Sequence, residues 1–190
     1  MPMKTAVVTS PHFFVEENAI IEGFFEAGLD LLHIRKPDSD PLFCERLLTL
    51  IPSRWRKRII VHDHFYLKDE YSLKGIHLTI RNQAPPKNYN GFMTRSCNDI
   101  DELRQWSGRC GYVLMKATEE NLHRAQTEGL INSNVFAKEA MNIEDIHRFR
   151  KMGFGGVVFE HTLWDKFDSF ESSNYKDLIN FFKELRKAAY

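Results

Sequence analysis

The sequence predicts a (β/α)8 barrel, because short apolar segments alternate with helix-like segments along the chain and the connections between them are short. Residues 59–61, Ile-Ile-Val, are β-branched and are typical of a strand buried on both faces. An open doubly wound sheet would need a glycine-rich turn after the first strand, and residues 10–14 do not form one. At 190 residues the chain is shorter than the typical barrel of about 250, so we expect shortened loops.

Hydrophobic periodicity and punctuation by glycine and proline give the expected elements. The expected strands are residues 5–9, 29–35, 59–61, 75–78, 91–96, 112–115, 135–137 and 155–159. The expected helices are residues 15–27, 42–51, 65–73, 100–106, 119–128, 143–152 and 175–188. Asn98 is the expected N-cap of the fourth helix and Thr118 that of the fifth. No linker or composition break interrupts the series, so we expect one domain spanning residues 1–190.

Composition excludes several classes of function. Lysine plus arginine and aspartate plus glutamate number 26 each, so no overall field attracts nucleic acid or an anionic membrane. The one dense basic run, residues 54–58, precedes a strand and is expected on the rim opposite the site, as a solvated surface. The three cysteines show no metal-ligand spacing, and no signal-peptide core or apolar run of about 20 residues is present. A cytoplasmic protein that binds neither nucleic acid nor membrane is expected.

Polar side chains follow the third predicted strand where it ends, at His62, Asp63 and His64. In a parallel barrel such side chains converge on the ligand. His62, His64 and His77 also raise the alternative of a transition-metal site, since strand residues two apart share a face and imidazole binds zinc. Local spacing fixes no third ligand, so hydrogen bonding among these histidines is the favoured interpretation.

Five motifs occur in an order that is more specific than any one of them. They are HIRKP after strand two, IIVHDH at strand three, GIHL at strand four, TRSCNDIDEL after strand five and GFGGVVF at strand eight. Across nearly the whole chain this series resembles the thiamine phosphate synthase and TenI superfamily. The resemblance implies a barrel with its site at the carboxyl ends of the strands. It also implies either of two reactions: joining a pyrimidine methyl pyrophosphate to a thiazole phosphate with magnesium, or isomerising a thiazole carboxylate phosphate.

The resemblance places the family's strand-two motif, Gln-x-Arg-x-Lys, over His33, Arg35 and Pro37. His33 is the TenI-like variant, and Lys36 stands where the synthase usually has an acid. Arg35 is implied as a pyrophosphate ligand, because a guanidinium donates two charge-assisted hydrogen bonds to an oxyanion. The alternative is that Arg35 only holds the rim through an ion pair with a nearby aspartate, Asp63 or Asp38.

The family's Asn-Asp pair after strand three lies over His62 and Asp63. Asp63 is the implied magnesium ligand, whereas histidine is a poor replacement for an amide that holds pyrophosphate. The family's second magnesium carboxylate lies over Asn82, which supplies no charge, so magnesium binding should be weakened. Ser96 lies over the serine that helps to hold pyrophosphate, and its alternative role is a helix cap.

The last third of the chain departs from the family pattern. The synthase has a long lysine-bearing loop after strand six, whereas here Lys116 and one further residue lead straight to a capped helix. Glu139 stands where the family has glycines near the thiazole phosphate, and Glu160 follows strand eight. We therefore expect these two carboxylates to close the phosphate end of the site, with part of the repulsion offset by Lys138 and His161.

Two classes of function follow. One is an enzyme of thiamine biosynthesis, a synthase or a TenI-like tautomerase, that binds a small phosphorylated pyrimidine or thiazole. The other is a degenerate family member that binds another small ligand or a partner protein without the parent chemistry. A homodimer is compatible with both, and no catalytic residue is assigned. The expected ligand-binding residues at the carboxyl-end rim are His33, Arg35, Lys36, His62, Asp63 and Ser96, with Asp63 also the metal ligand.

Overall fold

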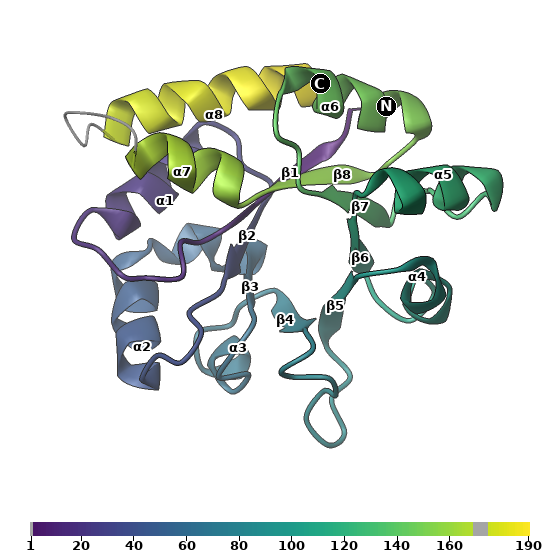
Figure 1. Ribbon diagram of the computed structural model, residues 1–190. Helices are drawn as coiled ribbons and strands as arrows, with labels where there is room; N and C mark the ends of the chain where they lie inside the picture. The colour runs from purple at the N-terminus through teal and green to yellow at the C-terminus, as the bar shows by residue number, and fades with distance from the viewer. Residues whose placement is uncertain (1, 169–174) are drawn as a thin grey trace.

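Eight parallel strands close into a barrel in the computed structural model, which describes residues 2–168 and 175–190. Each strand pairs with its neighbour in sequence, and β8 pairs with β1 (Figure 1). The strands are β1 (Lys4–Val8), β2 (Leu31–Ile34), β3 (Ile59–Val61), β4 (Gly75–Leu78), β5 (Phe92–Cys97), β6 (Tyr112–Lys116), β7 (Val135–Lys138) and β8 (Gly156–Phe159). The predicted (β/α)8 barrel is confirmed.

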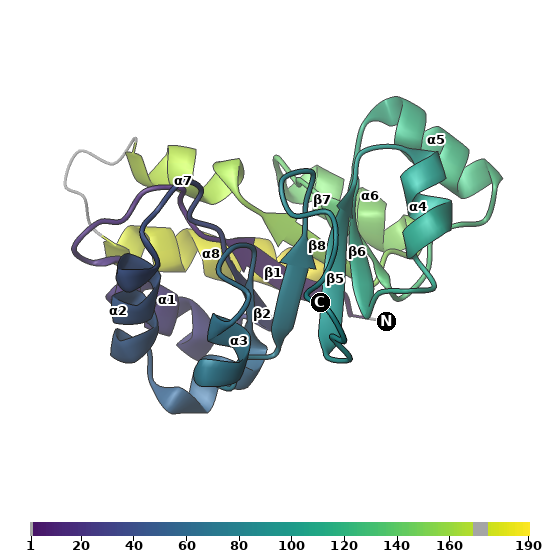
Figure 2. The ribbon, with the colours of Figure 1, turned by 90° about the horizontal axis from the view of Figure 1, so that it is seen from below.

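Helices surround the barrel, with α1 to α3 on one side and α4 to α6 on the other when the strands are seen side-on (Figure 2). They are α1 (Glu17–Glu26), α2 (Pro41–Leu50), α3 (Leu67–Glu70), α4 (Ile100–Trp106), α5 (Glu119–Thr127), α6 (Ile143–Met152), α7 (His161–Asp168) and α8 (Tyr175–Ala189). A 3-10 helix, η1 (Ser53–Arg58), precedes β3. The segment between β4 and β5 contains no helix and projects from the barrel wall (Figure 1).

Two apolar clusters form the core. The larger lies between the strands and the helices, and the smaller fills the barrel interior. The interior cluster includes Tyr112, Phe136, Leu31 and Ile60. His33 and His77 also lie inside the barrel with no exposed surface, so a polar layer sits on this apolar one. Buried polar groups need hydrogen-bond partners, and this requirement organises the site described below.

Three details of the expected elements are wrong. Asn98 does not cap α4; Asp99 does, and its Oδ1 accepts from the backbone N–H of Glu102 at 2.9 Å. The Glu102 carboxylate accepts from the backbone N–H of Asn98, the residue before the cap, at 2.7 Å. The third helix is a single turn, and α7 was not predicted. The Thr118 cap of α5 is confirmed.

The basic run forms η1, and Lys57 and Arg58 lie beside Lys4, at the amino end of the barrel. This rim is opposite the strand ends that carry the candidate site. Among the described residues, none of the helices is long and apolar enough to cross a membrane.

Candidate active site at the carboxyl ends of the strands

A cavity of about 580 Å³ opens at the carboxyl ends of the strands. Three of the predicted ligand-binding residues line it, namely Arg35, His62 and Ser96. The other lining residues are Thr79, Ile80, Arg81, Gln83, Arg95, Asn98, Glu102, Lys138, Glu160 and His161. Four of the lining side chains are cationic and two are carboxylates, so the cavity suits an anionic ligand better than a cationic one.

A hydrogen-bonded chain of rings runs up the barrel interior to the cavity. Tyr112 Oη lies 2.5 Å from His33 Nε2, and His33 Nδ1 lies 2.9 Å from His62 Nε2. His62 Nδ1 is buried and has no hydrogen-bond partner among the described residues. At one end of this series of rings, His62 lines the cavity at the strand ends. At the other end, Tyr112 lines a depression at the amino end of the barrel.

His77 connects the same layer to β5. Its Nδ1 lies 2.7 Å from Thr94 Oγ1 and its Nε2 lies 2.8 Å from Ser96 Oγ. Thr94 Oγ1 donates to the carbonyl of Ile76 at 3.3 Å, so it accepts from the His77 Nδ1–H. His77 Nε2 is then an acceptor, and Ser96 donates its hydroxyl proton to it. Asp99, not Ser96, caps α4, and the Ser96 oxygen retains accepting capacity at the cavity.

The three histidines are neutral at physiological pH. Burial lowers the pKa of His33 to about 3 and holds the pKa values of His62 and His77 well below the usual range. Their nitrogens lie close enough to suggest a metal site. However, the rings of His62 and His77 stack with centroids 4.1 Å apart and planes 23° apart, so their in-plane lone pairs run side by side instead of converging. His64 lies elsewhere and bonds the carbonyl of Ser39. Hydrogen bonding, the favoured interpretation, fits this geometry.

Arg35 reaches the cavity and pairs with Glu160. Its Nη1 lies 3.1 Å from Glu160 Oε1, and Lys138 Nζ lies 2.8 Å from Glu160 Oε2. The Glu160 carboxylate is only 5% exposed, so both cations hold it in a largely buried position. The alternative partners suggested for Arg35, Asp63 and Asp38, are wrong, because β8 brings a residue 125 positions away against β1 and its neighbours.

Glu139 occupies the amino end of α7. Its carboxylate accepts from the backbone N–H groups of Glu160, His161 and Thr162 at 3.0, 3.3 and 3.1 Å, and from Thr162 Oγ1 at 2.8 Å. Such N–H groups, with the positive end of the helix dipole, form a ready anion site. The side chain of Glu139 thus takes the place that a phosphate would need.

Asp63 faces hydrogen-bond donors. Arg81 Nη2 lies 3.3 Å from its Oδ1, and the Asn82 Nδ2 lies 3.2 Å from the same oxygen and 3.0 Å from the His62 carbonyl. Magnesium needs an octahedron of oxygen ligands, whereas a guanidinium and an amide N–H surround this carboxylate. The donor set around Asp63 does not fit a magnesium ion.

Comparison with known proteins decides the family. A crystal structure described as thiamine phosphate pyrophosphorylase from Bacteroides thetaiotaomicron is 44% identical to this chain, covers 98% of each chain and superposes with a TM-score of 0.91. The chain belongs to the thiamine phosphate pyrophosphorylase family. A thiamine phosphate pyrophosphorylase from Pyrococcus furiosus, 15% identical, covers 98% of this chain and 95% of its own with a TM-score of 0.77. A structure from Aquifex aeolicus VF5, also 15% identical, covers 98% and 92% with a TM-score of 0.72.

Those two distant structures show the fold alone. No family model matches the sequence, and no curated protein matches it. The assignment to the thiamine phosphate pyrophosphorylase family therefore rests on the full-length match at 44% identity.

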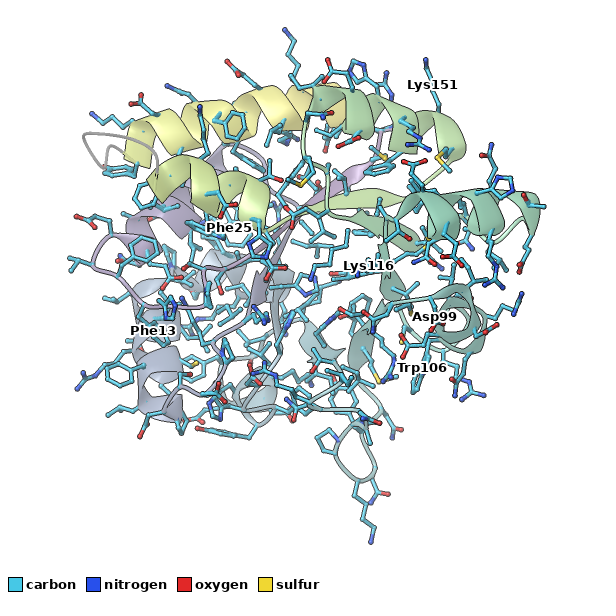
Figure 3. The ribbon with its side chains drawn as sticks, in the orientation of Figure 1. Phe13, Phe25, Asp99, Trp106, Lys116 and Lys151 are labelled. Atoms are coloured by element: carbon cyan, nitrogen blue, oxygen red, sulfur yellow. The ribbon has the colours of Figure 1, made fainter. Side chains whose placement is uncertain are left out.

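Lys36, one of the residues that resemblance to the family singled out, lies outside the cavity lining. Its Nζ is fully buried, donates to the carbonyls of Ser10 and His12 at 2.8 and 2.9 Å and pairs with Glu17. It lies over the ring of Phe13, on the α1 and α2 side of the barrel (Figure 3). Alternation along an extended chain could have indicated this, since Lys36 follows Arg35 and points to the opposite face.

Arg95, Thr94 and Tyr112 belong to the site and were not predicted. The Arg95 guanidinium stacks on the ring of Trp106 at 4.3 Å and donates to the Gln83 carbonyl at 3.1 Å. Trp106 lies across the barrel from Phe13 (Figure 3). Thr94 shares the inward face of β5 with Ser96, and period-two alternation would have found it. Tyr112 is an aromatic residue at the start of a strand, and only the three-dimensional path of its ring brings its hydroxyl to His33.

Proposed function

We propose that this protein acts in thiamine biosynthesis and binds a small phosphorylated pyrimidine or thiazole in the carboxyl-end cavity. The observation that carries the proposal is full-length identity of 44% to a protein described as a thiamine phosphate pyrophosphorylase. The cationic lining of the cavity supports it, because phosphate and pyrophosphate need paired charge and directed donors.

The reaction proposed first is the synthase reaction, in which a pyrimidine methyl pyrophosphate and a thiazole phosphate join and pyrophosphate leaves. Negative charge develops on the leaving group, and fixed cations near it lower the barrier. Arg35 and Lys138 are placed for that role, provided that the pyrophosphate competes with Glu160 for them. His62 would add a hydrogen bond from the same wall. The residues around Asp63 do not support a magnesium-dependent step.

The test is turnover by the purified protein with both substrates and magnesium, read as pyrophosphate and thiamine phosphate formed. The proposal expects product from the wild type and a loss of about 100- to 1,000-fold in Arg35→Ala, the range for removing one donor that stabilises developing negative charge. Arg54→Ala is the matched control, because Arg54 is an exposed arginine on the opposite rim. Absence of product under all conditions would overturn the synthase assignment.

A second candidate is a family member that binds a ligand without this chemistry, or that isomerises a thiazole as TenI-like proteins do. Two observations favour it: Glu139 fills the anion position at α7, and Glu160 neutralises charge on Arg35 and Lys138. The connection between β6 and α5 is also only Ala117 and Thr118, as expected. Thermal-shift screening with phosphate, pyrophosphate and thiamine intermediates, followed by a tautomerase assay, separates these outcomes.

We also propose a cytoplasmic location, which the three buried free cysteines, Cys44, Cys97 and Cys110, support. Assembly as a homodimer is a further proposal, and sedimentation equilibrium tests it.

A further inference from the structure

The buried hydroxyl of Tyr112 determines where protons sit in the ring chain. Its only hydrogen-bond partner among the described residues is His33 Nε2. Burial raises the pKa of Tyr112 well above its usual value, so the hydroxyl keeps its proton. A buried O–H must donate to an acceptor or remain unsatisfied, and His33 Nε2 is the acceptor at hand. Nε2 of His33 therefore carries no proton.

The remaining positions follow in turn. A neutral imidazole has one N–H and one acceptor nitrogen, so His33 carries its proton on Nδ1. That Nδ1–H donates to His62 Nε2, 2.9 Å away. His62 Nε2 is then the acceptor, and His62 carries its proton on Nδ1, the buried atom that lacks a partner among the described residues.

The reverse direction of donation leaves more groups unsatisfied. If His62 Nε2–H donated to His33 and His33 Nε2–H donated to Tyr112, the tyrosine proton would have no described acceptor. The His62 Nδ1 lone pair would also stay unpaired. The direction from Tyr112 to His62 leaves a single unpaired group in the described chain of rings, the Nδ1–H of His62, so it is the favoured one.

We propose that His62 binds the ligand as an Nδ1–H donor, that the ligand atom it meets is an acceptor oxygen, and that Tyr112 and His33 are positioning residues that fix this tautomer. His62 belongs to the lining of the cavity together with Arg35 and Lys138, whose charges attract an oxyanion to the same space. That the oxygen belongs to a phosphate or pyrophosphate rests on the proposed function. The position of the proton does not.

Nitrogen-15 spectra of the histidine rings in the labelled protein test the proton positions directly. The wild type is expected to show neutral rings with the proton on Nδ1 for both His33 and His62. In Tyr112→Phe the acceptor His33 Nε2 loses its donor, and His62 is expected to become a mixture of the two tautomers. Tyr89→Phe is the matched control, because it deletes a tyrosine hydroxyl that bonds the Phe92 carbonyl outside the chain of rings, and it should leave these signals unchanged.

Titration with pyrophosphate, monitored by calorimetry, tests whether the His62 Nδ1–H binds an oxyanion. Wild-type affinity is expected to fall about three- to tenfold in Tyr112→Phe, the effect of weakening one hydrogen bond, and to be unchanged in Tyr89→Phe. The inference would be overturned if His62 of the wild type carried its proton on Nε2. It would also be overturned if His62 had the same tautomer in Tyr112→Phe as in the wild type. If the spectra show the assigned proton positions but the protein binds neither phosphate nor pyrophosphate, the ligand assignment is overturned. This result would count against the proposed function, while the assigned tautomer of His62 would stand.

Discussion

Replacing Glu139 by alanine should both destabilise the protein and open an anion site. The Glu139 carboxylate accepts three backbone N–H groups and one hydroxyl at the start of α7. Losing a carboxylate cap from a helix amino end costs about 1–2 kcal/mol. For a domain of this size, that corresponds to a fall in Tm of roughly 2–8 °C. Differential scanning calorimetry of wild type and Glu139→Ala measures it.

Added phosphate should then act differently on the two proteins. The vacated N–H groups can receive an oxyanion, so millimolar phosphate should raise the Tm of Glu139→Ala while leaving the wild type nearly unchanged. Glu139→Gln is the control, because its amide oxygen can still accept and its side chain still fills the space. Equal stability of Glu139→Ala and wild type, or an equal phosphate response, would refute the view that this carboxylate occupies an anion position.

Four further predictions concern the carboxylates Glu139 and Glu160, Asp63, and the buried pair of Glu17 and Lys36. Under the second candidate function, Glu139→Gly with Glu160→Gly should gain measurable affinity for thiazole phosphate without gaining turnover, because the short connection after β6 is unchanged. Tight binding by the wild type in fluorescence titration would contradict this and favour the synthase reaction. Calorimetry should find that pyrophosphate binding does not depend on magnesium and is unaffected by Asp63→Ala, because Arg81 and Asn82 surround the Asp63 carboxylate. A micromolar complex that forms only with magnesium would contradict this. Glu17→Ala should lower the free energy of unfolding by about 3–5 kcal/mol, because it leaves the Lys36 ammonium buried without its partner. Glu22→Ala, which breaks an exposed pair with Arg54, should lower it by less than about 1 kcal/mol. Urea unfolding measures both. Burial raises the pKa of Glu17 from 4.5 to about 7, so protonation of this carboxyl favours the folded state, and the stability that it adds is present at low pH and is lost as pH rises through about 7. The stability difference between wild type and Glu17→Ala should therefore shrink as pH rises over that range, and a difference that grows would contradict this.

Local patterns were enough for the barrel. Residues 59–61 and 143–152 have the predicted bounds, because β-branched runs and a 3.6-residue period depend on nearby residues. The helix α7 was missed for the opposite reason. Its amino end is capped by Glu139, more than twenty residues earlier in the chain, so no adjacent residue signals its start.

The site was predictable in its location and not in its pairings. The carboxyl ends of β2, β3 and β5 bring Arg35, His62 and Ser96 to one cavity, as strand alternation requires. The partner of Arg35 lies 125 residues away, so only barrel closure reveals it. Asn98 and Asp99 are equally good caps by type, and the backbone N–H of Glu102 decides between them, because it donates to the side chain of Asp99.

Histidine was expected to be a poor replacement for the family's pyrophosphate-binding amide at position 62. Whether it is one depends on which ring nitrogen of His62 carries the proton. A histidine with its proton on Nδ1 offers an N–H donor from the cavity wall, which is the hydrogen-bonding function of an amide N–H. On this view His62 need not mark a loss of anion binding, and the positions that count against the parent chemistry are Glu139 and Glu160.

The central claim is that an anionic ligand binds in the carboxyl-end cavity through Arg35. Calorimetric titration of wild type, Arg35→Ala and Arg54→Ala with pyrimidine methyl pyrophosphate tests it most directly. We expect binding to the wild type and to Arg54→Ala with equal affinity, and an affinity at least about tenfold lower in Arg35→Ala, the effect of losing one charge-assisted hydrogen bond. No binding to the wild type, or equal binding to all three proteins, would contradict the claim.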